Sequence, residues 1–165
     1  MRHRESPATN GAPSENVQDD GPHEDTTRHA LAAEVALVGA MAQSSEARTH
    51  AVRMIDPGDF TREAHRVLFA TICELHAEGS PVDNITINDR LIETGKLDEA
   101  GGLVGIFDCT SLEGCPIIAS WPTYATIVAR EARRRRGITK LTRAIERLEA
   151  GEDPAVVAGE LGAVA

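Results

Sequence analysis

The sequence predicts an all-α protein: a compact multi-helix orthogonal bundle followed by a long helix and a partial helical hairpin. Two observations favour this fold class. The 165 residues include only five aromatic side chains, too few for the core of a β-sandwich or barrel. The apolar residues instead recur at three- and four-residue steps, between glycines and prolines that end such segments. We therefore expect helices packed through Ala, Leu and Ile side chains.

The composition divides the chain into three parts. Residues 1–27 contain two arginines and six acidic residues, a net charge of −4, and only four apolar residues. Such a segment buries too little apolar surface to offset the entropy cost of ordering, so we expect a disordered acidic tail. Residues 28–119 are expected to form a helical globular domain. Residues 120–165 are expected to form a long helix and a short second helix, an arm for dimerisation or for a partner.

Three helical segments are expected in the first half of the globular domain. Their ranges are about 26–41, 44–55 and 61–78. A threonine at 26 or 27 can cap the first, and a serine at 44 or 45 can cap the second. An Asp-Pro-Gly-Asp turn at residues 56–59 separates the second from the third. Gly79 follows the third helix at the place of a left-handed C-terminal cap.

Two shorter helices are expected next. Thr86, with an aspartate three positions later, fits the capped start of a helix that ends at Gly95. The run at 85–87 alone would suit a strand, but the polar residues that follow break the alternation that a strand requires. Asp98 is the expected cap of the second helix, which ends near Ser111.

A long helix is expected from Ser120, with a proline in its first turn, to Gly151. A helix of ~30 residues spans ~45 Å, more than a small domain needs. Asp153-Pro154 begins a second, shorter helix, which completes the partial hairpin. Apolar residues at helical and near-heptad spacing mark the long helix, and we expect a partner or oligomer interface there. The expected interface residues are Tyr124, Ile127, Val128, Ile138, Leu141 and Ile145.

The long helix also carries the strongest charge feature. Between residues 130 and 147, eight basic residues stand against two acidic ones, a net charge of +6. One interpretation is a contact site for nucleic acid or for an acidic partner, for which the acidic tail could compete. The alternative is a solvated face whose arginines pair with Glu131 and Glu146. The candidate contact residues are Arg133, Arg134, Arg135, Arg136 and Lys140.

No motif for catalysis or cofactor binding stands out. The single Gly-Lys pair, Gly95-Lys96, lacks the upstream glycine of a phosphate-binding loop. The patterns G-x-S-x-G, H-E-x-x-H and G-x-G-x-x-G do not occur. The three cysteines have no C-x-x-C spacing and are expected in the core. We therefore expect no catalytic residue, no cofactor and no metal ion.

His65 could act as a base or a ligand, because Asp59 and Glu63 lie close to it in the sequence. No second ligand stands four positions later, which disfavours a metal site. We expect a structural role, in which His65 forms a hydrogen bond across the turn to Asp59.

Two absences bear on the cellular location. No run approaches the roughly 20 apolar residues of a membrane span. The N-terminus lacks the apolar stretch of a secretion signal. We therefore expect a cytoplasmic protein with no membrane partner.

Five ordered motifs lie within residues 29 to 150. They are Ala33-Glu34-Val35-Ala36-Leu37-Val38-Gly39-Ala40; Asp59-Phe60 with His65-Arg66 and Phe69; Gly79-Ser80-Pro81-Val82-Asp83 with Thr86; Leu91, Gly95 and Leu97 with Gly101-Gly102; and Tyr124-Ala125 with Ile127-Val128, Glu131 and the arginines beside it. In this order and spacing they resemble the N-terminal domain of bacterial replicative DNA helicases of the DnaB type.

The resemblance implies an all-α domain that, in full-length helicases, dimerises, builds a ring-shaped collar and contacts primase and loading factors. The helicase motor that should follow is missing from this sequence, so ATP hydrolysis and strand separation are not implied. We expect a DNA replication protein that is not an enzyme and that binds itself, a replicative helicase or a primase. The alternative is a nucleic-acid-binding regulator that uses Arg133 to Arg136, with weak DNA binding.

Overall fold

The computed structural model describes residues 22–111, 114–115 and 117–162, and it contains helices and turns but no β-strand within these ranges. The helices are α1 (Pro22–Gln43), α2 (Ser45–Met54), α3 (Glu63–Ala77), α4 (Asn84–Glu93), α5 (Gly102–Thr110), α6 (Trp121–Glu149) and α7 (Pro154–Gly162). Two 3-10 turns, η1 (Pro57–Asp59) and η2 (Ile118–Ser120), precede α3 and α6. The predicted all-α fold class is confirmed.

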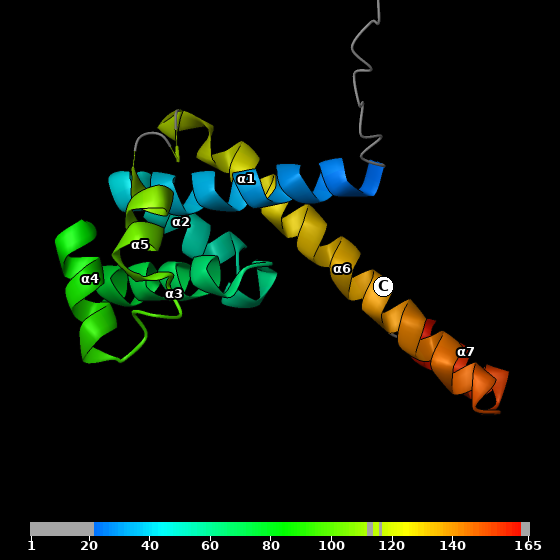
Figure 1. Cartoon of the computed structure of the whole chain (residues 1–165). Helices are drawn as coiled ribbons and strands as arrows, with labels where there is room; N and C mark the ends of the chain where they lie inside the picture. Colours follow the sequence, from blue (N-terminus) through cyan, green and yellow to red (C-terminus); the bar gives the residue numbers. More distant parts are fainter. Residues whose placement is uncertain (1–21, 112–113, 116, 163–165) are drawn as a thin grey trace, which may run out of the picture.

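Helix α1 lies at the centre of the bundle and packs against α2, α3, α5 and α6 (Figure 1). Its small residues allow this close packing. A Cβ atom on Gly39 would lie 2.7 Å from the carbonyl oxygen of Cys109 and 2.8 Å from Cβ of Cys115, so only glycine fits there. Large side chains fill the remaining core, and the rings of Phe60 and Phe69 lie 4.9 Å apart.

The helix limits confirm several predicted caps. The Ser44 hydroxyl accepts a hydrogen bond from the backbone N–H of Ala47 at the start of α2. Gly79 follows α3 with φ +71°, the left-handed conformation that glycine adopts without steric cost. The carboxylate of Asp153 accepts a bond from Ala155 N–H at the start of α7.

Three helix starts differ from prediction. Helix α1 begins at Pro22 instead of residue 26 or 27, so the expected tail overlaps it; residues 1–21 lie outside the described part of the chain. Helix α4 is capped by Asp83, which accepts bonds from two backbone N–H groups, while Thr86 is its third residue. Helix α5 begins after Gly101, at φ +81°, and Asp98 lies in the preceding turn. At α4 the Asp83 carboxylate satisfies two N–H groups of the helix end, which Thr86 inside the helix does not.

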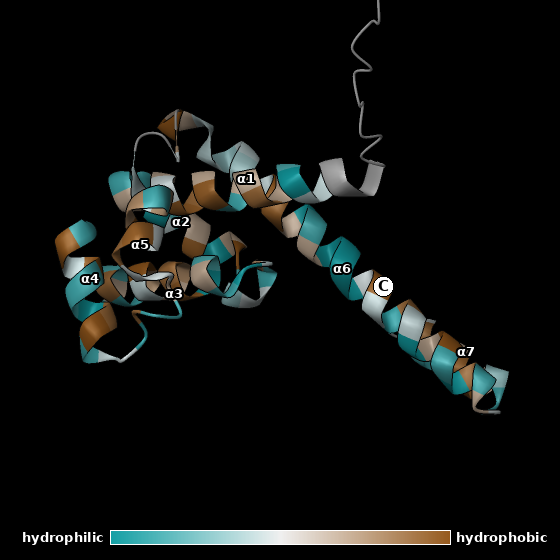
Figure 2. Cartoon of the chain, in the orientation of Figure 1, coloured by the Kyte–Doolittle hydropathy of each residue, from teal (hydrophilic) through white to brown (hydrophobic). Residues whose placement is uncertain are grey.

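Helix α6 belongs both to the bundle and to an extension from it. Its first half buries Ala125, Val128 and Ala132, and it packs against α1. Beyond the arginine run, α6 leaves the bundle and pairs with α7 to form an arm, residues 138–162 (Figure 1). The ribbon is hydrophilic where α6 leaves the bundle (Figure 2). Among the described residues, no helix is both long and apolar enough to cross a membrane.

Candidate interaction surfaces

A buried carboxylate on α1 joins this helix to the start of α3. Glu34 is 1% exposed; its Oε1 accepts a hydrogen bond from Thr61 N–H at 2.7 Å, and its Oε2 lies 2.7 Å from Nδ1 of His65. A carboxylate only accepts, so Nδ1 is the donor. Burial acts to raise the pKa of Glu34, but the bonds from His65 and Thr61 outweigh it and lower that pKa. Both carboxylate oxygens of Glu34 therefore have hydrogen-bond partners within the protein, and the contact connects α1 to α3.

The predicted bond between His65 and Asp59 is therefore wrong. The true partner, Glu34, lies 31 positions earlier in the chain and reaches His65 only because α1 packs against α3. His65 is buried, and its ring bonds within the protein.

Asp59 makes a second joint, between the η1 turn and α6. The residue is 5% exposed, and its Oδ2 accepts a hydrogen bond from Asp56 N–H at 3.0 Å. Its Oδ1 accepts a bond from Nη1 of Arg136 at 2.5 Å, and its backbone carbonyl accepts one from Arg135. These bonds hold α6 where it leaves the bundle, and we call them the Asp59 anchor.

The arginine run does not form a single basic surface. Arg135 and Arg136 are held by the Asp59 anchor, and Arg134 pairs with the buried carboxylate of Glu131 at 2.9 Å. Among the described residues, Arg133 has no ion-pair partner, and neither has Lys140. Pairing of arginines with Glu131 was predicted; no arginine pairs with Glu146 within the described part of the chain. Two of the five candidate contact residues therefore remain unpaired.

The predicted apolar interface on α6 divides into two parts. Val128 is 1% exposed and belongs to the core, so its assignment to a free interface was wrong. Tyr124 and Ile127 are partly buried and pack against the core beside α1. Four apolar residues of α6 are open on the arm, and we call them the arm stripe: Ile138, Leu141, Ile145 and Leu148, which are 52%, 57%, 56% and 43% exposed.

A cleft of about 330 Å³ lies between α6 and α7, and we call it the hairpin cleft. Its lining residues are Lys140, Arg143, Ala144, Arg147, Val157, Glu160 and Leu161. Arg147 bonds to Glu152 and Glu160, which closes the hairpin. Lys140 and Arg143 have no ion-pair partner among the described residues. The cleft therefore presents two unpaired cations beside apolar side chains.

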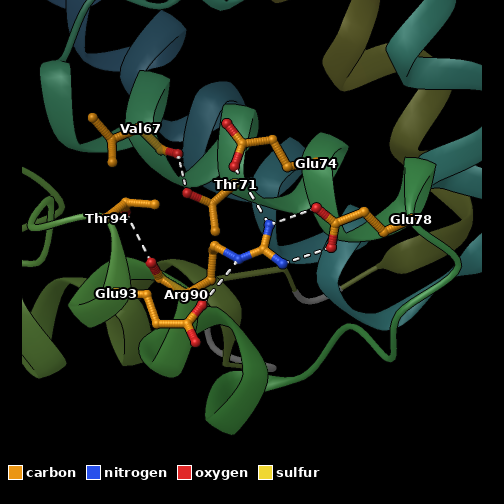
Figure 3. Close-up of polar contacts among 7 residues, drawn as sticks. All are labelled: Val67, Thr71, Glu74, Glu78, Arg90, Glu93 and Thr94. Carbon is orange, nitrogen blue, oxygen red and sulfur yellow. Dashed lines mark hydrogen bonds and ion pairs between the residues drawn. The ribbon is translucent and has the colours of Figure 1, made fainter.

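A cluster of four charged residues joins α3 to α4 (Figure 3). Arg90 donates to both carboxylate oxygens of Glu78, at 3.0 and 2.6 Å, and lies near Glu74 and Glu93. The hydrogen bond from Arg90 lowers the pKa of Glu78. The carboxylates are directed at the guanidinium, so the cluster holds α3 and α4 together.

No group of three metal-ligating side chains occurs among the described residues.

The sequence did not indicate a second exposed apolar face, on α4 and α5. Ile85 is 79% exposed, Val104 70%, Leu103 54% and Phe107 53%. The periodic pattern placed Leu103, Val104 and Phe107 on a helix, but periodicity does not distinguish a face that packs from one that stays open. Only the placement of the neighbouring helices shows that this face is open.

Comparison with known proteins gives the family. Residues 26–130 match the family model described as DnaB-like helicase N terminal domain. The chain belongs to this family. The match spans α1 to the first third of α6 and ends before the arm.

The relatives of this DnaB-like domain include much longer proteins. It is 34% identical over 128 residues to the replicative DNA helicase DnaB of Mycobacterium leprae, covering 78% of this chain and 21% of that protein. It is 32% identical over 112 residues to the replicative DNA helicase DnaC of Bacillus subtilis, covering 68% and 24%. The chain thus spans about a quarter or less of the length of these relatives.

Solved structures place the fold in the same family. The crystal structure of the N-terminal domain of DnaB helicase from Mycobacterium tuberculosis matches with a TM-score of 0.74 and 32% identity, over 81% of this chain and 94% of that one. A structure of a DnaB-like replicative helicase and its interactions with primase matches with a TM-score of 0.60 and 19% identity, over 79% and 31%. The second match shows the shared fold.

The motif residues of the DnaB-like domain serve its architecture. Glu34 and His65 form the buried joint, Asp59 forms the anchor, and Phe60 lies in the core. Of the motif glycines, Gly39 lies at the crossing of helices, and Gly79, Gly95, Gly101 and Gly102 have positive φ. Asp83 caps α4, and Thr86 donates a hydrogen bond to the carbonyl of Pro81. The contacts that these side chains make are therefore within the domain.

Proposed function

We propose that this DnaB-like domain is a non-motor interaction module of DNA replication, which assembles with itself through the arm stripe and contacts a replicative helicase or a primase. The observation that carries the proposal is the arm stripe itself, four large apolar side chains left open on an extended hairpin. Apolar faces of this kind on a projecting helix are typical of protein interfaces.

The spacing of the arm stripe suits a second helix. Ile138, Leu141, Ile145 and Leu148 follow one another at steps of three, four and three residues. These steps are those of the a and d positions of a heptad, whose side chains interlock with a facing helix. Helix α7 covers Ala144 and leaves the stripe free. A second copy related by a two-fold axis would cover both stripes at once.

The relatives supply the biological context of the proposal. Curated relatives are replicative DNA helicases, and a protein of the same fold was solved with its interactions with primase. The sequence has no phosphate-binding loop, so the proposed role does not include ATP hydrolysis. A role beside a replicative helicase implies a cytoplasmic location.

A nucleic-acid regulator is less well supported. Binding to phosphates requires cations that are free to face the backbone of the nucleic acid. Arg134, Arg135 and Arg136 already bond to Glu131 or Asp59. The unpaired cations are spread along the arm and lie beside apolar side chains, which favours a protein partner.

Light scattering coupled to size exclusion tests the proposal, with the domain alone and then mixed with the host's replicative helicase and primase. We expect a dimer or larger assembly, and a lower mass for Ile138→Asp and Leu141→Asp with helix content retained. Ile92→Asp is the matched control, because Ile92 is 56% exposed on α4, away from the arm. A monomer at tens of micromolar that ignores both proteins would overturn the proposal.

A further inference from the structure

The hairpin cleft combines unpaired positive charge with an apolar floor. Lys140 and Arg143 line it without an ion-pair partner among the described residues, whereas Arg147 is already bonded to Glu152 and Glu160. Ala144 and Val157 form buried parts of its wall. A ligand that fits must bring carboxylates together with a small apolar side chain, a description that suits an acidic peptide.

We propose that the hairpin cleft binds residues 15–21 of the same chain. This segment reads Glu-Asn-Val-Gln-Asp-Asp-Gly and carries three carboxylates and no cation. Val17 lies midway between Glu15 and Asp19, and alternate residues of an extended chain project to the same side. The order acid, apolar, acid therefore complements cations beside an apolar floor.

The segment is long enough to reach the cleft. His29 of α1 and Arg130 of α6 line the same surface pocket, which fixes where the two helices meet. From there to Pro22 is about 10 Å along α1, and to Lys140 about 15 Å along α6. Seven extended residues span up to ~24 Å, and the lysine and arginine side chains add to this reach. The N-terminal end of α1 and the arm extend to the same side of this meeting point (Figure 1).

Tethering favours this segment over free acidic peptides. The segment is joined directly to α1, and such attachment holds a ligand at an effective concentration in the millimolar range, so weak contacts suffice for occupancy. The arm stripe lies on another side of α6, so the inference does not depend on the proposed self-assembly.

Carbodiimide cross-linking of the full chain tests the inference, because it joins carboxylates to lysine amines that touch them. The chain has two lysines, Lys140 in the cleft and Lys96 after α4, so Lys96 serves as an internal control. Mass spectrometry of the digested protein should show residues 15–20 joined to Lys140 several-fold more than to Lys96. Raising salt from about 0.02 to 0.5 M should lower the yield, because screening weakens the attraction.

Two variants and a matched control define the contact. Arg143→Gln and Val17→Ser should each lower the Lys140 yield several-fold, while Arg133→Gln, which removes an exposed cation outside the cleft, should leave it unchanged. An equal mixture of 14N- and 15N-labelled protein should give pairs of a single isotope. Mixed-isotope pairs would assign the segment to a second copy and overturn the same-chain inference. Equal yields at both lysines would overturn the cleft as the binding site.

Discussion

Arg136 bonds to Asp59 across 2.5 Å and 77 positions of sequence, and this contact sets where the arm leaves the bundle. The Asp59 side chain is 6% exposed and that of Arg136 is 56% exposed. Water can solvate the arginine if the bond breaks, but it cannot reach the buried carboxylate, which therefore needs the bond more. Arg135 reaches the carbonyl of the same residue. Two consecutive arginines of the predicted contact patch therefore bond to the same residue of the bundle, at the base of the arm.

Replacing Arg136 by Gln should lower the free energy of unfolding by about 1 kcal/mol, the scale of a half-exposed ion pair. Arg133→Gln removes the same charge three positions earlier, where no ion-pair partner exists among the described residues, and should change stability little. Urea unfolding followed by circular dichroism measures both variants. If both substitutions lowered the free energy of unfolding equally, the loss would come from the change in net charge and not from the Asp59 anchor.

Glu34→Gln should destabilise the bundle by about 3 kcal/mol, because it removes the buried carboxylate that accepts hydrogen bonds from Thr61 and His65. The same urea titration measures this loss. Glu46→Gln is the control, since Glu46 is exposed at the start of α2. A loss below about 0.5 kcal/mol would contradict the structural role assigned to Glu34.

The stability that Glu34 contributes should depend on pH. Its pKa in the folded protein lies below the ordinary value of 4.5. A carboxylate with a lowered pKa stabilises the fold above its unfolded pKa, and this contribution is lost as pH falls through the folded pKa. The stability gap between the wild type and Glu34→Gln should therefore shrink as the pH falls from about 5 toward 3. Other carboxylates with lowered pKa values are shared by both proteins and cancel; a gap that widens on acidification would refute the assignment.

Gly39→Ala should destabilise the bundle by about 1–3 kcal/mol, because the new methyl group overlaps Cys109 and Cys115. Gly137→Ala is the matched change on α6, where a Cβ meets nothing within 4 Å. It should raise stability by up to about 1 kcal/mol, since alanine favours helix over glycine. Thermal unfolding of both variants checks the opposite signs.

The helices could be predicted from sequence because their signals are local. Periodic apolar residues located each helix, and Gly79 and Gly151 marked two ends correctly. The caps were less certain, because two polar residues near one helix start can each satisfy its N–H groups. Asp83 and Thr86 bond to each other's backbone, so the local sequence alone does not reveal which residue begins the helix.

The sites could be predicted less well because they depend on contacts between distant segments. The partner of His65 is on another helix, and the burial of Val128 depends on where α6 passes over α1. The stripe on α6 reads as continuous in sequence from Tyr124 to Leu148, but the bundle covers its first part only. The point where a helix leaves a core is not encoded in its periodicity.

The Asp59 anchor holds α6 at the base of the arm, the point about which the arm would pivot. About 13 residues separate Arg136 from the end of α6, a length of roughly 20 Å. A rotation of α6 by about 10° at this point displaces the tip of the arm by about 3.5 Å, more than half the rise of a helical turn. A small change in the Asp59–Arg136 contact, at the base of the arm, is therefore magnified in the angle between the subunits of any assembly joined by the arms.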